Sequence, residues 1–178
     1  SMPSVRFEVR LLSREGKNAL SASGADEVSF VMSANAGEAL GPISRIASGG
    51  ELSRIMLALK NVFAEKDGVD ALIFDEIDTG VSGVAAQRVA EKLASLGRTK
   101  QVLCVTHLPQ IAAMAQQQYL VEKAEHGGRT YTNIRLLDRE GRRYELARLS
   151  GGDMITDIQL AGAEELLARD ERFRASLS

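Results

Sequence analysis

The chain has 178 residues and a formal net charge of -2, with 44% hydrophobic and 26% charged residues. A chain of this length can bury a hydrophobic core in one domain. Its charge balance argues against a basic nucleic-acid-binding surface over the whole chain. The sequence has no run of 18 or more apolar residues and no charged segment followed by an apolar stretch at its start, so we expect neither a membrane span nor a signal peptide.

A single cysteine, Cys104, excludes an internal disulfide and fits a reducing compartment. Residues 1–2 look like a remnant of tag cleavage and are left out of the fold. Apolar and polar residues then alternate over residues 5–12, which predicts a half-buried strand, and residues 28–32 predict a second. We expect the two strands to form a hairpin around a loop at 18–26.

The middle of the chain predicts a strand–helix–strand unit. A loop over residues 35–42 precedes a helix at 51–64, which a capping box of Ser48 and Glu51 begins. The apolar run at 71–74 predicts a strand buried on both faces. A helix at 85–96 and a strand at 101–106 follow, and this spacing favours a parallel crossover.

The last third predicts a helix, a hairpin and a final helix. Pro109 fits the first turn of a helix at 109–116. Strands are expected at 118–123 and 129–137, with a turn between them. A helix is expected at 155–168, and residues 171–178 are expected to be a flexible tail.

Two adjacent carboxylates, Asp75 and Glu76, directly follow the first buried strand. Open α/β sheets bind their ligands at the carboxyl ends of parallel strands. Neighbouring carboxylates repel unless a cation is present, and Mg²⁺ bound to a nucleotide would supply one. In that case Asp75 would serve the metal shell and Glu76 would orient or deprotonate the attacking water. The alternative is a solvated pair of acids at the start of a loop.

A glycine pair, Ser48-Gly49-Gly50-Glu51, opens the first long helix. Glycines allow close approach of the backbone to a ligand, and a helix N-terminus suits phosphate. The alternative is a plain capping box. The similar string Ser150-Gly151-Gly152-Asp153 precedes no strand ending in two acids, so it is interpreted as an ordinary loop and helix cap. No stretch matches the phosphate loop G-x-x-x-x-G-K-[ST], so the chain lacks half of a nucleotide site.

Three further residues lie near the ends of these strands. His107 could donate to a γ-phosphate, or it could be a surface or capping histidine. Cys104 lies inside an apolar strand, which favours an inert thiol over a nucleophile. Asp78 lies in a polar turn just after the acids, and this turn could be structural or could make a contact across a dimer.

In this order the motifs resemble the C-terminal half of an ABC-type ATPase head. Residues 47–51 resemble the signature motif, residues 72–75 resemble Walker B, and Glu76 occupies the position of the catalytic glutamate. Asp78 resembles the D-loop aspartate, and His107 resembles the switch histidine. Longer strings are similar to the RecN family, the bacterial SMC-like DNA repair proteins, over about residues 28–167; these strings are 46–60, 74–83 and 105–112.

This resemblance implies the fold class and the site. The fold would be α/β, the C-terminal lobe of an ABC-type ATPase head over residues 3–170, with a mainly parallel sheet flanked by helices and with peripheral antiparallel strands. ATP and Mg²⁺ would be the cofactors of the complete head. Glu76 and His107 would be catalytic, and Asp75 would reach Mg²⁺ through water. The nucleotide-binding residues would be Ser48, Gly49, Gly50, Glu51 and Asp78.

The resemblance also implies partners. The N-terminal lobe of the same protein, separated by a long coiled coil, would carry the phosphate loop. A second head would complete a homodimer, with Ser48 and Gly50 of one head meeting the ATP of the other. The full-length protein would hydrolyse ATP and act on DNA in recombinational repair of double-strand breaks, in the bacterial cytoplasm at the nucleoid and with no membrane partner. The chain alone is expected to be inactive.

A non-catalytic alternative remains open at this point. The chain could be a dimerisation or DNA-docking module that uses basic residues such as Arg129, Arg142 and Arg143. The simpler interpretation of these three arginines is a solvated face.

Overall fold

The computed structural model describes residues 5–14, 16, 20–22, 24–33, 37, 39–46, 49–63, 66 and 68–177. The chain divides into two compact units, Ser1–Leu52 and Ser53–Ser178. The predictions for residues 1–2, and the one for Ser48, lie outside the described residues. Within the described ranges, no helix combines the length and the hydrophobicity that crossing a membrane requires.

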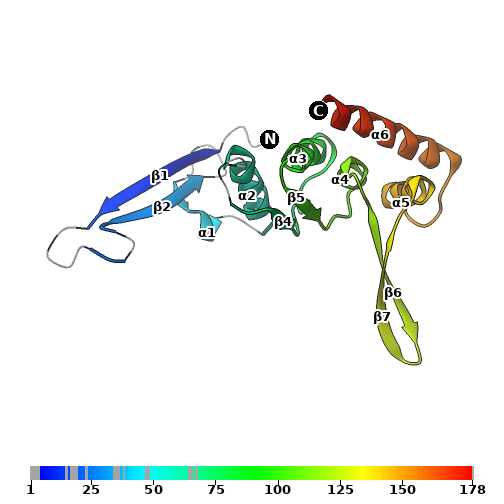
Figure 1. The fold of residues 1–178 in the computed structure, drawn as a ribbon, viewed down its shortest axis with the longest axis horizontal. Helices are drawn as coiled ribbons and strands as arrows, with labels where there is room; N and C mark the ends of the chain where they lie inside the picture. The colour runs from blue at the N-terminus through cyan, green and yellow to red at the C-terminus, as the bar shows by residue number, and fades with distance from the viewer. Residues whose placement is uncertain are drawn as a thin grey trace. The chain divides into compact units, whose positions relative to one another are not determined.

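The first unit contains a small antiparallel sheet (Figure 1). Strand β1 (Arg6–Ser13) pairs with β2 (Asp26–Ser33) along their whole length, which confirms the predicted hairpin. Strand β3 (Gly41–Pro42) pairs with the end of β2 and runs into the short helix α1 (Ile43–Ile46). The sequence predicted only a loop before residue 43, because a two-residue strand has no periodicity to detect.

The second unit is built around a parallel pair of strands. Helix α2 (Gly49–Phe63) runs across the boundary between the units, and its extent confirms the predicted helix. Strand β4 (Ala71–Phe74) pairs in parallel with β5 (Gln101–Cys104), and α3 (Gly83–Leu96) connects them. The strand–helix–strand prediction is therefore confirmed, although β5 ends earlier than expected. Helix α4 (Pro109–Met114) follows β5.

A hairpin and two helices complete this unit (Figure 1). Strands β6 (Tyr119–His126) and β7 (Arg129–Leu136) pair antiparallel, as predicted. Helix α5 (Arg139–Gly151) was not predicted, because nearly half of its residues are charged and it shows no clear apolar stripe. Asp138 begins this helix by accepting a hydrogen bond from the Gly141 N–H at 2.8 Å.

The second glycine string lies at the end of α5. Gly152, with φ of 80°, ends the helix and donates its N–H to the Arg148 oxygen at 2.8 Å. Helix α6 (Asp157–Ser176) begins separately, with a capping box made by Thr156 and Gln159. The string therefore ends one helix and does not cap the next.

Helix α6 is longer than the sequence predicted. Residues 171–176 were expected to belong to a flexible tail, but they form the last turns of α6. The physical reason lies in two side chains, because Phe173 packs against buried apolar residues and Arg174 donates to the Met114 oxygen at 2.9 Å.

Two apolar clusters form the core of the second unit. The first lies between α2, the β4–β5 pair, α3 and α4, and contains Leu57, Phe74, Ile77, Ala90, Leu93, Leu96, Ile111 and Met114. The second lies between α4, α5 and α6, and contains Ala112, Ala113, Leu146, Ala147, Ala163 and Leu167. Helix α4 contributes to both clusters, so it is enclosed by apolar neighbours on more than one side.

The prediction that β4 is buried on both faces is wrong for this chain. Phe74 is buried and Leu72 packs against the first cluster, but the side chain of Ile73 on the opposite face is 75% exposed. Its neighbours Leu103 and Val105 are exposed as well. The core covers one face of this parallel pair, and no described residues cover the other.

Helix α4 ends against a buried arginine. The Arg142 side chain is 8% exposed, and its Nη2 donates to the oxygens of Ala113 at 3.1 Å and Ala115 at 2.9 Å. The last carbonyls of a helix have no partner within the helix, and a cation there also interacts favourably with the helix dipole. Burial, followed by the nearby charge of Arg174, lowers the pKa of Arg142.

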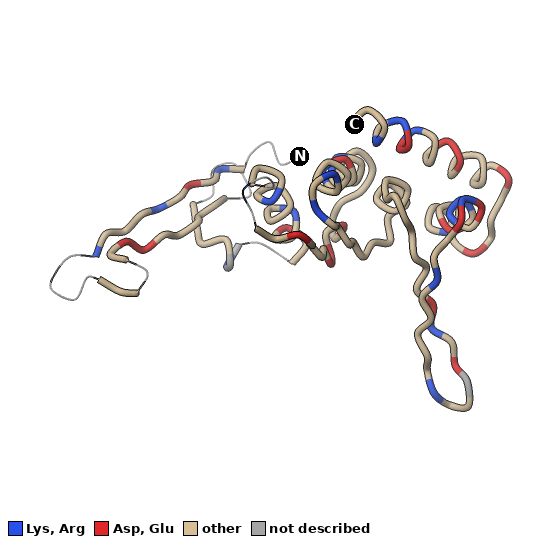
Figure 2. The backbone as a smooth tube through the Cα atoms, in the orientation of Figure 1, with Lys and Arg blue, Asp and Glu red and all other residues tan. Residues whose placement is uncertain are grey.

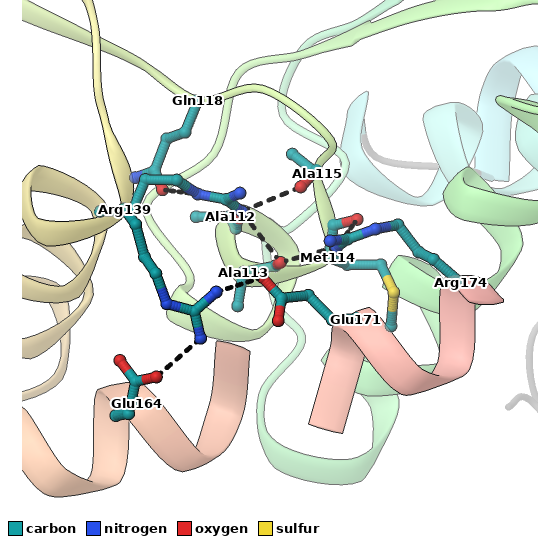
Figure 3. Close-up of polar contacts among 10 residues, drawn as sticks. Ala112, Ala113, Met114, Ala115, Gln118, Arg139, Glu164, Glu171 and Arg174 are labelled. Atoms are coloured by element: carbon teal, nitrogen blue, oxygen red, sulfur yellow. Dashed lines mark hydrogen bonds and ion pairs between the residues drawn. The ribbon is translucent and has the colours of Figure 1, made fainter. Parts of the chain in front are cut away.

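A second arginine joins α5 to α6 (Figure 3). Arg139 makes ion pairs with Glu164 and Glu171, each at 2.7 Å. Arg174 reaches from α6 to the end of α4 beside the same group. Arg139 thus ties α5 to α6, while Arg142 and Arg174 tie these two helices to α4.

We expect Arg142→Ala to lower the free energy of unfolding by about 3 kcal/mol, because it leaves several carbonyl oxygens without a charged donor. Urea unfolding followed by circular dichroism measures this value. Arg129→Ala, on the exposed strand β7, is the control and should change it by less than about 0.5 kcal/mol. Equal effects of the two substitutions would contradict the capping role of Arg142.

Candidate functional site

The acidic pair lies at the carboxyl end of β4, with both side chains exposed. Glu76 has φ of 57°, and among the described residues it is the only one besides glycine with positive φ. This left-handed conformation costs a non-glycine residue roughly 1–3 kcal/mol, so its surroundings must hold it in place. The Glu76 N–H donates to the Asp75 carboxylate at 2.9 Å, which orients the two acids relative to each other.

Contacts on either side of Glu76 fix the loop that carries it. Ile77 is 0% exposed and belongs to the first core cluster. The Thr79 N–H donates to the backbone carbonyl oxygen of Glu76 at 3.1 Å and closes a turn. The loop therefore begins in a strand and is anchored again one residue after Glu76.

Helix α2 also holds this loop, through two residues that sequence reasoning missed. The Ser53 hydroxyl donates to the backbone carbonyl oxygen of Asp75 at 3.0 Å. Arg54 donates to the oxygens of Ile77 at 3.2 Å and Thr79 at 2.7 Å. In the sequence, Ser53 and Arg54 are polar positions between the apolar positions of an amphipathic helix. That pattern predicts side chains that face solvent.

Asp78 connects the loop after β4 to the loop after β5. Its side chain is 4% exposed, and its Oδ2 accepts from the Thr106 hydroxyl at 2.7 Å and from the His107 N–H at 2.9 Å. Burial is the largest influence on the Asp78 pKa and raises it. The hydrogen bonds from Thr106 and His107, together with the charge of His107, outweigh burial and lower the pKa below its ordinary value.

His107 lies at this junction with its ring open to solvent. Its Nδ1 lies 3.0 Å from the Asp78 Oδ2, while the side chain is 73% exposed. An imidazole held at one nitrogen by a carboxylate can present its other nitrogen to a ligand. The structure thus brings Asp75, Glu76, Asp78 and His107 onto two adjoining loops.

Cys104 packs beside this junction, at the end of β5. Burial, followed by the charges of Asp78 and Asp75, raises the pKa of its thiol to about 12. The thiol therefore stays protonated at neutral pH, in agreement with the predicted inert cysteine.

The glycine motif belongs to the first unit, whereas these loops belong to the second. Gly49 and Gly50 open α2, and Glu51 lies in its first turn. Ser48 lies outside the described residues. The assignment of these four residues to a nucleotide stays a prediction.

The acidic pair has the chemistry of a magnesium site that needs further ligands. In the part of the chain that the structure describes, no group of three or more His, Cys, Asp or Glu side chains is arranged to hold a metal ion. Mg²⁺ in nucleotide sites takes one or two carboxylates and completes its shell with phosphate oxygens and water. Asp75 and Glu76, both exposed and adjacent, fit that limited demand.

The basic residues suggested for DNA docking do not form one surface. Arg142 is buried against α4, so neither docking nor a solvated face describes it. Arg143 pairs with Glu140 at 2.8 Å and lies over the Tyr144 ring. Basic and acidic positions are interspersed along α5 and α6 (Figure 2).

Curated proteins similar to this chain are named DNA repair protein RecN. The chain is 46% identical over 93% of its length to that of Halalkalibacterium halodurans, of which it covers 30%. It is 43% identical over 88% of its length to that of Bacillus subtilis, of which it covers 27%. The chain therefore spans about a third or less of the length of these relatives. No protein-family model matches it.

A solved structure shares the fold. The chain matches the crystal structure of the Smc head domain with a coiled coil and joint derived from Pyrococcus yayanosii, with a TM-score of 0.57 and 19% identity. The match covers 84% of this chain and 26% of that one. The predicted α/β class, with parallel strands, flanking helices and antiparallel strands elsewhere, is confirmed.

We expect Asp78→Asn to lower the free energy of unfolding at pH 7 by about 1–2 kcal/mol, because it weakens charge-assisted hydrogen bonds. Since the folded pKa of Asp78 lies below 3.8, the stabilisation is complete above that value and is lost as the pH falls through the folded pKa. Urea unfolding of both proteins between pH 3 and 7 should therefore show a difference that shrinks toward the acid end. A difference that stays constant with pH would contradict the account of this carboxylate.

Proposed function

This chain belongs to the RecN family and corresponds to part of the length of its relatives. We propose that it is the C-terminal lobe of an ATPase head that hydrolyses ATP when two heads pair. The observation that carries this proposal is the acidic pair Asp75–Glu76 on a loop held to His107 through Asp78. It lies at the carboxyl end of a parallel strand, the edge at which α/β sheets bind ligands.

Each residue of these loops has a role in the proposed reaction. Glu76 orients the attacking water and accepts its proton. Asp75 would hold Mg²⁺ through a water molecule, and the ion, when bound, would supply positive charge that offsets the charge of the phosphates. His107 donates to the γ-phosphate, and Asp78, which is buried, acts by holding the His107 ring.

The glycine motif serves the nucleotide of a second head. Gly49 and Gly50 open a helix, Glu51 lies in the same turn, and the N-terminus of a helix suits a phosphate. Ser48 precedes them in the sequence and completes the motif. ATP then lies between two heads, and its hydrolysis releases them, so that the nucleotide shifts the population between paired and separate heads.

Exposed apolar faces on two of the sheets support the proposal that a further lobe covers this chain. The face of the β4–β5 pair that bears Ile73 has no cover among the described residues. On the β6–β7 hairpin, Val121 and Ile134 lie opposite each other, and both are exposed. Parallel strands are normally buried on both faces, and exposed apolar patches mark interaction sites. The N-terminal lobe of the same protein, which carries the phosphate loop, is the proposed cover.

The full-length protein is proposed to act in recombinational repair of DNA double-strand breaks, in the cytoplasm at the nucleoid. The relatives named DNA repair protein RecN support the part of this proposal that concerns DNA repair. The alternative of a non-catalytic DNA-docking module has less support, because one of its three basic residues, Arg142, caps α4 from the interior.

We expect Glu76→Gln in the complete protein to reduce ATP turnover by about 100-fold or more, because the amide cannot accept the proton of water. ATP-dependent dimers should accumulate, as measured by light scattering with and without Mg²⁺-ATP. Glu165→Gln, at an exposed position of α6, is the matched control and should behave as wild type. Normal turnover in Glu76→Gln would exclude Glu76 as the base.

The chain of 178 residues alone should show no ATPase activity and at most weak nucleotide binding, because its sequence has no phosphate loop. Isothermal titration with Mg²⁺-ATP measures this directly. Tight, Mg²⁺-dependent binding would mean that the site is complete within this chain, contrary to the proposal.

A further inference from the structure

We propose that Arg54 is a positioning residue for ATP hydrolysis, which holds the loop of Glu76 and Asp78 in its reactive shape from helix α2. This inference rests on the proposed function, since it assigns a role within the same site. Arg54 does not contact the side chain of Glu76 or of Asp78. It binds the backbone carbonyls of the residues that follow each of them.

The contacts of Arg54 are directed at one short stretch of backbone. Its Nη1 donates to the Ile77 oxygen at 3.2 Å and to the Thr79 oxygen at 2.7 Å. These two carbonyls lie on either side of Asp78. One half-buried guanidinium therefore fixes the direction of the chain through the residue that holds His107.

The loop needs such an external donor. It lies between the end of β4 and the start of α3, so neither a strand ladder nor a helix supplies partners for these carbonyls. A carbonyl oxygen that loses a charged donor loses one of the stronger hydrogen bonds available to it. Arginine suits this task because its planar group holds several donors in a fixed arrangement, whereas lysine offers a point charge on a flexible stem.

The conformation of Glu76 explains why holding this loop would matter for hydrolysis. With φ of 57°, Glu76 is held where a non-glycine residue is strained. If the following residues are released, the strain favours a return of Glu76 to an ordinary conformation. A general base must stay within hydrogen-bond reach of its water, and small displacements reduce rates strongly.

The test compares Arg54→Ala and Arg54→Lys in the complete protein. Arg88→Ala is the matched control, because Arg88 lies on α3 with its side chain 68% exposed, where it pairs with Glu91 at 2.9 Å. Steady-state kinetics give kcat and KM for ATP. Amide hydrogen exchange of the nucleotide-free protein reports on the peptide that contains residues 76–81.

Arg54→Ala should lower kcat by about 10- to 100-fold and leave KM within about threefold, because the loop acts on the chemical step. Exchange in the peptide 76–81 should rise, while α3 keeps its protection. Arg54→Lys should recover part of kcat, and Arg88→Ala should match wild type. If Arg54→Ala does not fold, Arg54→Lys decides alone, and its kcat must then fall at least threefold with unchanged KM.

Two failures can be told apart. If wild type hydrolyses ATP but Arg54→Ala keeps its kcat, or its loop exchanges as in wild type, then only the role of Arg54 is overturned. A rise in KM with constant kcat would also overturn it, because that result indicates lost nucleotide binding. If the complete wild-type protein hydrolyses no ATP, the proposed function itself fails.

Discussion

The buried carboxylate of Asp78 is the contact on which the arrangement of the site depends. It accepts hydrogen bonds from Thr106 and His107, so it joins the loop after β4 to the loop after β5. Because the carboxylate is nearly excluded from water, its hydrogen bonds must be well made to offset the loss of hydration. Moving Asp78 would move His107 and would release the turn that holds Glu76.

The rest of the second unit supports this junction from outside. Ile77, beside Asp78, is fully buried in the first core cluster. His107 leads into α4, and the carbonyls at the end of α4 are held by Arg142 from α5 and Arg174 from α6. The last two helices therefore hold the end of α4, the helix that follows the His107 loop. This arrangement explains why residues 171–176 belong to the fold.

The sequence predicted those parts of the fold whose signal is local. The β4–α3–β5 unit follows from apolar runs and helical spacing, and the acids at the end of β4 follow from position alone. Helix α5 was missed because its few apolar residues, such as the buried Leu146 and Ala147, are interspersed with charged ones. Arg142 was assigned to the surface because burial of a cation depends on distant carbonyls, which a sequence does not show.

The same limit applies to the site. Asp75, Glu76 and His107 could be selected from their places at strand ends, but Ser53 and Arg54 could not, because their partners lie more than twenty residues away. The exposure of Ile73 was also unpredictable, since an apolar run gives no information on whether its cover lies in the same segment. Both cases depend on tertiary contacts that a single sequence does not contain.

The central claim is that this chain supplies half of an ATPase head and that another segment of the same protein supplies the phosphate loop. In the most direct measurement, this chain is mixed with a separately produced N-terminal segment of the same protein, and ATP turnover is followed. The account predicts turnover in the mixture and none in either part alone. A stable one-to-one complex of the two parts that binds ATP but hydrolyses none would contradict it.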